Sequence, residues 1–134
     1  MAPQRVLSIG QCGADHANLK GTIERHFDAE VVPAETAEEA LAELRQNPFT
    51  LVLVNRVVDA DASSGLDLVK RLKREQSLQD IPVMLVSNLE DAQREAITAG
   101  AVPGFGKAAL GQPMMIGRLA AYLQRTASNS RDEG

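Results

Sequence analysis

The sequence has few aromatic residues: no tryptophan, one tyrosine and three phenylalanines among 134 residues. We therefore expect an aliphatic core built from leucine, valine, isoleucine and alanine. The single cysteine, Cys12, excludes a disulfide within the chain and is typical of a reducing compartment, so we predict a cytoplasmic location. No apolar run approaches the about 20 residues that a transmembrane helix needs, and we predict no membrane partner.

The sequence also has no excess of basic residues, and its net charge is -4. A nucleic-acid surface needs a basic patch that attracts phosphates, so we predict no nucleic-acid partner. The main basic cluster, Lys70, Arg71, Lys73 and Arg74, is interleaved with Leu72. We interpret this cluster as the solvated face of a helix near its C-terminus, where cations favour the helix dipole.

Short β-rich runs and amphipathic helical windows alternate five times, which predicts an α/β domain with a parallel sheet. The expected strands are residues 6–9, 31–32, 49–54, 81–86 and 101–106. Pro33 should close the second strand, and Pro103 predicts that the fifth lies at a sheet edge. Five such units match the flavodoxin-like order 2-1-3-4-5 in a three-layer αβα sandwich. We assign residues 1–127 to this one domain and 128–134 to a polar tail that we expect to be disordered.

Several residues predict where helices begin and end. Thr36 followed three residues later by Glu39 is a capping box. Ser64 can cap the third helix, Asn88 the fourth, and Gly100 suits the left-handed position after the fourth. The apolar residues at helical spacing, which should face the core, are Leu19, Ile23, Phe27, Ala37, Leu41, Leu44, Leu68 (or Val69), Leu72, Met115, Leu119 and Tyr122.

Residues at the carboxyl ends of the strands are the first candidates for a functional site, because ligands of open α/β sheets bind there. Gly10 and Gln11 follow the first strand, and Asn55 follows the third. Ser87 follows the fourth strand and Lys107 follows the fifth. The topology therefore predicts that these side chains lie near one another.

At these positions residues 5 to about 125 resemble the receiver domain of bacterial two-component response regulators. The resemblance is carried by the segments RVLSIGQ, LVLVNRVV, SGLDLVKRLK, IPVMLVSN and GAVPGFGK. It implies two acidic residues after the first strand that hold a divalent cation, and a phosphoacceptor aspartate after the third. It further implies Ser or Thr after the fourth strand and Lys after the fifth.

This sequence departs from that pattern at the residues that carry the chemistry. The acidic pair falls on Gly10 and Gln11, and the phosphoacceptor falls on Asn55. Magnesium requires hard oxygen ligands, usually carboxylates, and an amide is a poor nucleophile. Gly104 stands at the family's aromatic position, and Phe105 beside it should face the core. We therefore predict a pseudo-receiver that is neither phosphorylated nor an enzyme and that binds no metal or other cofactor.

Two residues agree with the receiver pattern. We expect Lys107 to point into the degenerate pocket and to hydrogen-bond the side-chain oxygen of Asn55, replacing the missing ion pair. Ser87 is equally well explained as part of the cap of the following helix.

The resemblance implies that the protein acts by binding a protein partner or a second copy of itself, as a homodimer. The implied surface is the face made by the fourth helix, the fifth strand and the fifth helix, residues 88–124. Its exposed candidates are Arg94, Met114 and Arg118.

Two alternatives remain open from the sequence. One is a small-molecule or redox sensor that uses the same crevice, with Cys12, Gln11 and Lys107 as contacts. The other is a receiver phosphorylated on a displaced carboxylate, Asp59 or Asp61, in the loop after the third strand. We interpret both aspartates as parts of a solvated turn.

Overall fold

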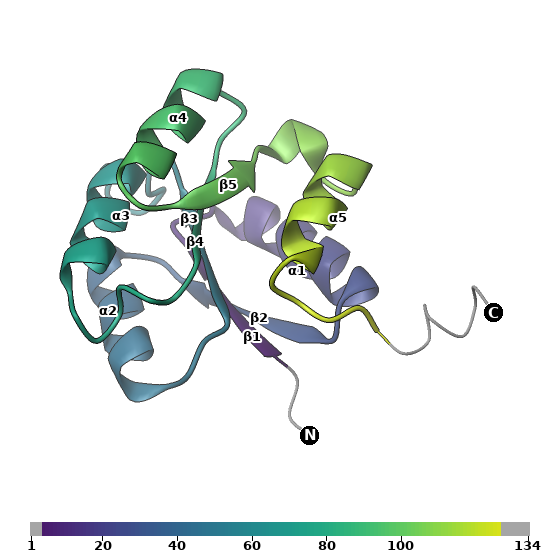
Figure 1. The fold of residues 1–134 in the computed structure, drawn as a ribbon, viewed down its shortest axis with the longest axis horizontal. Helices are drawn as coiled ribbons and strands as arrows, with labels where there is room; N and C mark the ends of the chain where they lie inside the picture. Colours follow the sequence, from purple (N-terminus) through teal and green to yellow (C-terminus); the bar gives the residue numbers. More distant parts are fainter. Residues whose placement is uncertain (1–3, 127–134) are drawn as a thin grey trace.

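The computed structural model describes residues 4–126, so the expected polar tail at 128–134 lies outside the described residues. Five parallel strands form one sheet in the order β2-β1-β3-β4-β5 (Figure 1). Their bounds are Gln4–Ile9 for β1, Ala29–Ala34 for β2, Leu51–Asn55 for β3, Val83–Val86 for β4 and Val102–Phe105 for β5. The predicted flavodoxin-like order is confirmed.

Helices cover both faces of the sheet, which gives the three predicted layers. α2, α3 and α4 lie on one side of the sheet and α1 and α5 on the other (Figure 1). Their bounds are Gly13–His26 for α1, Ala37–Gln46 for α2, Gly65–Arg74 for α3, Glu90–Thr98 for α4 and Pro113–Ala120 for α5. A single 3₁₀ turn, η1, spans Lys107–Ala109.

The core divides into two aliphatic clusters because alternate residues of each strand face opposite sides of the sheet. In β3, Val52 and Val54 pack with α2 and α3, whereas Leu51 and Leu53 pack with α1 and α5. The core-facing helical residues predicted from the sequence are buried, except Ala37 and Tyr122, which are partly buried; Phe105 is buried as well. β3 therefore lies at the centre of the sheet, as an apolar strand covered on both faces should.

The local signals at the helix ends have mixed outcomes. Thr36 caps α2, since the amide of Glu39 donates to its Oγ1 at 3.2 Å, and Ser64 caps α3 in the same way. The predicted start of α4 at Asn88 is wrong: Leu89 is the N-cap residue and the helix begins at Glu90. The side chain of Asn88 makes a tertiary contact instead of capping α4: its Oδ1 accepts the amide of Ala108 at 3.0 Å.

The second strand is longer than predicted, and Pro33 does not close it. β2 continues through Pro33 to Ala34, with Ser8 of β1 opposite Pro33. β2 is an edge strand, where a missing backbone N–H can face away from the ladder. The fifth strand also lies at an edge, as its own proline predicted.

The basic cluster of α3 is not simply a solvated face. Lys73 donates from Nζ to the carbonyl oxygens of Gln79 and Ile81, both at 2.9 Å. Burial lowers the pKa of Lys73. Its aliphatic stem lies against Gly100, which has the positive φ, +113°, expected of the residue after α4.

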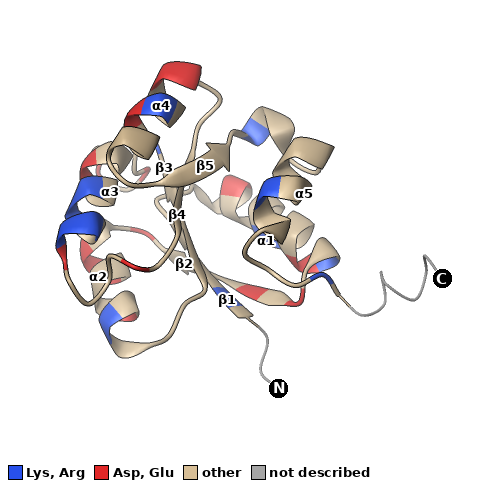
Figure 2. Ribbon diagram, in the orientation of Figure 1, with Lys and Arg blue, Asp and Glu red and all other residues tan. Residues whose placement is uncertain are grey.

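Acidic and basic residues both occur on α2, α3 and α4, and the basic residues of α3 follow its acidic first turn (Figure 2). Several are paired, as in Arg45–Glu75 and Arg71–Glu38, which link neighbouring segments. Within residues 4–126 no helix is long and apolar enough to cross a membrane.

Candidate functional site

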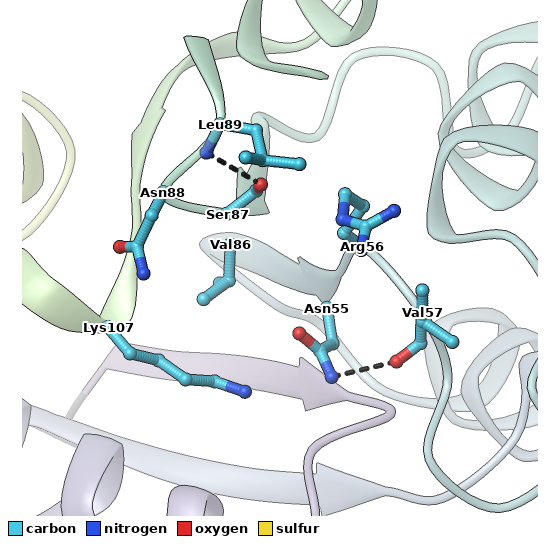
Figure 3. Close-up of a pocket in the computed structure, with 8 residues that line it drawn as sticks. All are labelled: Asn55, Arg56, Val57, Val86, Ser87, Asn88, Leu89 and Lys107. Carbon is cyan, nitrogen blue, oxygen red and sulfur yellow. Dashed lines mark hydrogen bonds between the residues drawn. The ribbon is translucent and has the colours of Figure 1, made fainter. Parts of the chain in front are cut away.

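The carboxyl ends of β3 and β4, together with η1, enclose a pocket of about 380 Å³ (Figure 3). Three of the residues singled out from the sequence, Asn55, Ser87 and Lys107, line it together. The complete lining is Asn55, Arg56, Val57, Val86, Ser87, Asn88, Leu89 and Lys107. None of these eight described residues is acidic, and two are cationic.

Asn55, the last residue of β3, uses its side chain to hold the surrounding backbone. Its Nδ2 donates to the carbonyl oxygen of Gly10 at 3.1 Å and to that of Val57 at 2.8 Å. Both partners are acceptors, so the nitrogen must be the atom that faces them. A carboxylate has no proton to donate there. The phosphoacceptor position is therefore occupied by a group that the local structure requires as a donor.

The acidic-pair positions lie beside this network and outside the pocket lining. Gly10 has a φ of +79°, and a Cβ added to it would lie 3.0 Å from the Cα of Val58. An acidic side chain at this position would therefore strain the backbone. Gln11 is half-buried, and neither polar atom of its side chain has a hydrogen-bond partner within the described part of the chain.

The divalent cation implied by the receiver pattern does not fit these residues. Gly10 offers no side chain, Gln11 offers a neutral amide, and the amide nitrogen of Asn55 is committed to two carbonyls. A magnesium site relies on one or two carboxylates. Across residues 4–126, no group of three or more His, Cys, Asp or Glu side chains is placed to hold a metal ion.

Lys107 lines the pocket, but its expected hydrogen bond to Asn55 is wrong. Its Nζ lies 2.7 Å from Oδ2 of Asp15, in the first turn of α1. The hydrogen bond from Lys107 lowers the pKa of Asp15, and a second hydrogen bond from the thiol of Cys12 lowers it further. The ammonium thus has a carboxylate partner 92 positions away in the chain. The sequence analysis did not identify Asp15 as the partner of Lys107. The available signal was an acidic residue in the first helical turn after the loop that follows β1.

Ser87 contributes to the turn before α4. Its Oγ accepts the amide of Leu89 at 3.1 Å (Figure 3), and its own amide donates to the carbonyl oxygen of Phe105 at 3.0 Å. The hydroxyl proton is not used in that hydrogen bond. Ser87 thus lies in the turn before α4, but its hydroxyl does not cap the helix, because the N-terminus of α4 has no side-chain cap.

Of the residues that the two alternatives use, Lys107 lines the pocket, whereas Gln11, Cys12, Asp59 and Asp61 lie outside its lining. Asp59 and Asp61 are both exposed, and Oδ1 of Asp61 accepts the amide of Ser63 at 3.0 Å, which is a local turn. A hydrogen bond from the Ser63 hydroxyl, and then that from the Ser63 amide, lower the pKa of Asp61. Cys12 is half-exposed at the N-cap of α1 and hydrogen-bonds Asp15.

A second hollow, of about 660 Å³, lies between α4, β5 and α5. It is lined by all three residues predicted for a partner surface, Arg94, Met114 and Arg118, and each of them is exposed. Met114 has 43% of its surface exposed, so it contributes apolar surface to this hollow. Arg94 pairs with Asp91, and Arg118 donates to the carbonyl oxygen of Gly104. We refer to this hollow as the α4-β5-α5 groove.

No protein-family model matches the chain. The chain is similar to the chemotaxis protein CheY1 of Helicobacter pylori, with 32% identity over 81 residues. The aligned part spans 60% of this chain and 64% of the length of CheY1.

Solved structures of response regulators share the fold. The receiver domain of the Francisella response regulator 1452 has a TM-score of 0.74 and 18% identity, covering 88% of this chain and 94% of that chain. A response regulator from Thermotoga maritima has a TM-score of 0.71 and 21% identity, covering 89% and 96%. The fold is therefore that of response-regulator receiver domains. The sequence similarity to CheY1 agrees with this fold.

Proposed function

We propose that this protein is a non-phosphorylatable pseudo-receiver, an atypical response regulator that takes part in signal transduction by binding proteins. The observation that carries the proposal is the side chain of Asn55, whose amide donates to the carbonyl oxygens of Gly10 and Val57. This amide stands where a receiver has its nucleophile, and its hydrogen bonds hold the neighbouring backbone in place. The role is one of binding, without catalysis, cofactor or metal, and its proposed place is the cytoplasm.

The charge arrangement supports the same proposal. A receiver concentrates negative charge around a cation, whereas the pocket lining here carries Arg56 and Lys107 and no carboxylate. The nearby carboxylate of Asp15 already has Lys107 as its partner. Without a phosphoryl group that interacts differently with two conformations, phosphate supplies no free energy to shift between them. The conformation is then set by the sequence.

Incubation with acetyl phosphate and magnesium, followed by intact-mass measurement, tests the loss of phosphorylation. A receiver with a complete acidic set, treated in parallel, serves as the positive control. We expect the control to gain one phosphoryl group and this protein to gain none. A phosphoryl adduct that disappears in Asp59→Asn or Asp61→Asn would replace the proposal with the displaced-acceptor alternative.

The proposed binding surface is the α4-β5-α5 groove. Its lining combines the exposed apolar Met114 with two cationic residues, Arg94 and Arg118, and one acidic residue, Glu90, which suits a partner that presents an apolar residue and more acidic than basic groups. The occupant is another protein or, because homo-oligomers are common, a second copy of this chain.

Sedimentation over a range of protein concentrations tests the second-copy form. Met114→Lys should weaken self-association, since it places a charge at the exposed apolar residue of the groove. Asn18→Lys, on the exposed side of α1, is the matched control and should leave sedimentation unchanged. A strictly monomeric protein would exclude the homodimer and leave a different protein as the occupant. Self-association that both variants weaken equally would place the contact outside the groove.

The sensor alternative has less support, because Cys12 and Gln11 lie outside the pocket lining. The thiol of Cys12 is directed to Asp15, which is already paired with Lys107.

A further inference from the structure

The helix α4, which forms one wall of the groove, has few apolar contacts of its own. Of its nine residues, all described, only Ala96 is buried. The N-cap residue Leu89 is 54% exposed and Ile97 is 44% exposed. A helix this short is marginal by itself, and most of its stability must come from tertiary contacts. Apolar packing of α4 is therefore limited to small side chains, Ala96 in the core and the partly buried Ala92 against it, which leaves a large role for polar contacts.

The side chain of Gln93 supplies such contacts. Its Nε2 donates to the carbonyl oxygens of Leu85 and Ser87 at 2.9 and 3.1 Å, at the end of β4. Its Oε1 accepts the amide of Gly104 in β5 at 3.1 Å. One half-buried amide thus connects α4 to both strands beneath it.

Gly104 is the residue at which this connection meets α5. The pairing of β4 with β5 is irregular here, with Val102 and Phe105 in register and Gly104 between them. Its amide is bonded by Gln93 from α4, and its carbonyl oxygen is bonded by Nη1 of Arg118 from α5. A Cβ at Gly104 would lie 2.3 Å from the carbonyl oxygen of Leu85, so this close approach requires glycine.

We propose that Gln93 and Arg118, acting through the peptide groups of Gly104, form a clamp that positions α4 and α5 relative to each other and sets the shape of the groove. Both are positioning residues. The clamp gives a physical basis for a binding surface that has one conformation without phosphorylation, and in this respect the inference rests on the proposed function.

Amide hydrogen exchange of the full chain, read out segment by segment, tests the clamp. Gln93→Leu removes the donors and the acceptor and keeps a branched side chain that is one atom shorter. We expect amides of α4 to exchange about tenfold faster, because buried carbonyl and amide groups lose their partners. Gln112→Leu is the matched control. Gln112 lines the same groove and is exposed, and its side chain does not cap α5, at whose N-terminus it lies. This substitution should leave the exchange rates of α4 unchanged.

The decisive measurement is the effect that crosses from one helix to the other. If Gly104 couples the helices, Gln93→Leu should also speed exchange in α5, and Arg118→Leu should speed exchange in α4. Exchange in α1, corrected for global stability, should not change. If Gln93→Leu fails to fold, Gln93→Met is measured in its place.

Three results would overturn the clamp. Exchange in α4 could stay unchanged in Gln93→Leu. Acceleration could be confined to the helix that carries each substitution, or it could be spread equally over all segments. These results concern the free protein and do not depend on a partner. A phosphoryl adduct would instead remove the proposed function and leave the clamp intact, so the two failures are distinguishable.

Discussion

Replacing Asn55 with aspartate should destabilise the protein, although it restores the residue type that a receiver uses at this position. The substitution exchanges the Nδ2 donor for a carboxylate oxygen that faces the carbonyl oxygens of Gly10 and Val57. Two hydrogen bonds are lost, each with a net contribution of about 0.5–1.5 kcal/mol. We therefore expect the free energy of unfolding to fall by about 1–3 kcal/mol at pH 7.

The effect of Asn55→Asp should also depend on pH. Facing two carbonyl oxygens raises the pKa of the introduced carboxyl in the folded state above its unfolded value of about 3.9. The folded state then keeps the proton to higher pH, so the deficit relative to the native sequence grows as pH rises through and above about 4. Below about pH 4 the protonated carboxyl can donate one hydrogen bond again, and the deficit should shrink.

Asn88→Asp is the matched control for this prediction. Asn88 uses its Oδ1 as an acceptor from the amide of Ala108, a role that a carboxylate keeps. Urea denaturation of the two variants and the native protein gives the three free energies of unfolding, with equal slopes expected. The reasoning is refuted if Asn55→Asp is as stable at pH 7 as the native sequence, or if both variants lose the same amount.

Two further predictions concern α1 and its ion pair. Gly21 lies inside α1, and a Cβ added to it would meet no atom outside the helix within 4 Å. Gly21→Ala should therefore raise the free energy of unfolding by about 0.5–1 kcal/mol in urea denaturation. A decrease in the free energy of unfolding would contradict this reasoning. Asp15 has a pKa lowered from 3.8 by Lys107, so its contribution to stability is complete above that value and is lost as pH falls through the folded-state pKa. Acid titration of Lys107→Met should therefore show a smaller loss of stability below about pH 4 than the native protein, and an unchanged acid profile would contradict the ion pair.

The fold was predictable because its signals are local and repeated. The alternation of apolar strands with amphipathic helices indicates the α/β fold class. The run from Leu51 to Val54, which is apolar on both faces of the strand, indicates the central strand. The cap at Thr36 and the glycine at Gly100 act on neighbouring backbone groups, so they could be recognised from a few residues. The prediction failed where a distant group competed, as when Ala108 engaged the Asn88 side chain.

The amino-acid sequence by itself determined the order of the elements and which side chains stand at the strand ends, because both follow from spacing along the chain. Only the tertiary structure decided what those side chains do: Asn55 bonds the backbone near it in space, and Lys107 pairs with Asp15 across 92 positions. A hydrogen bond goes to whichever partner folding brings within about 3 Å, and the direction of a side chain cannot be read from the residue type alone.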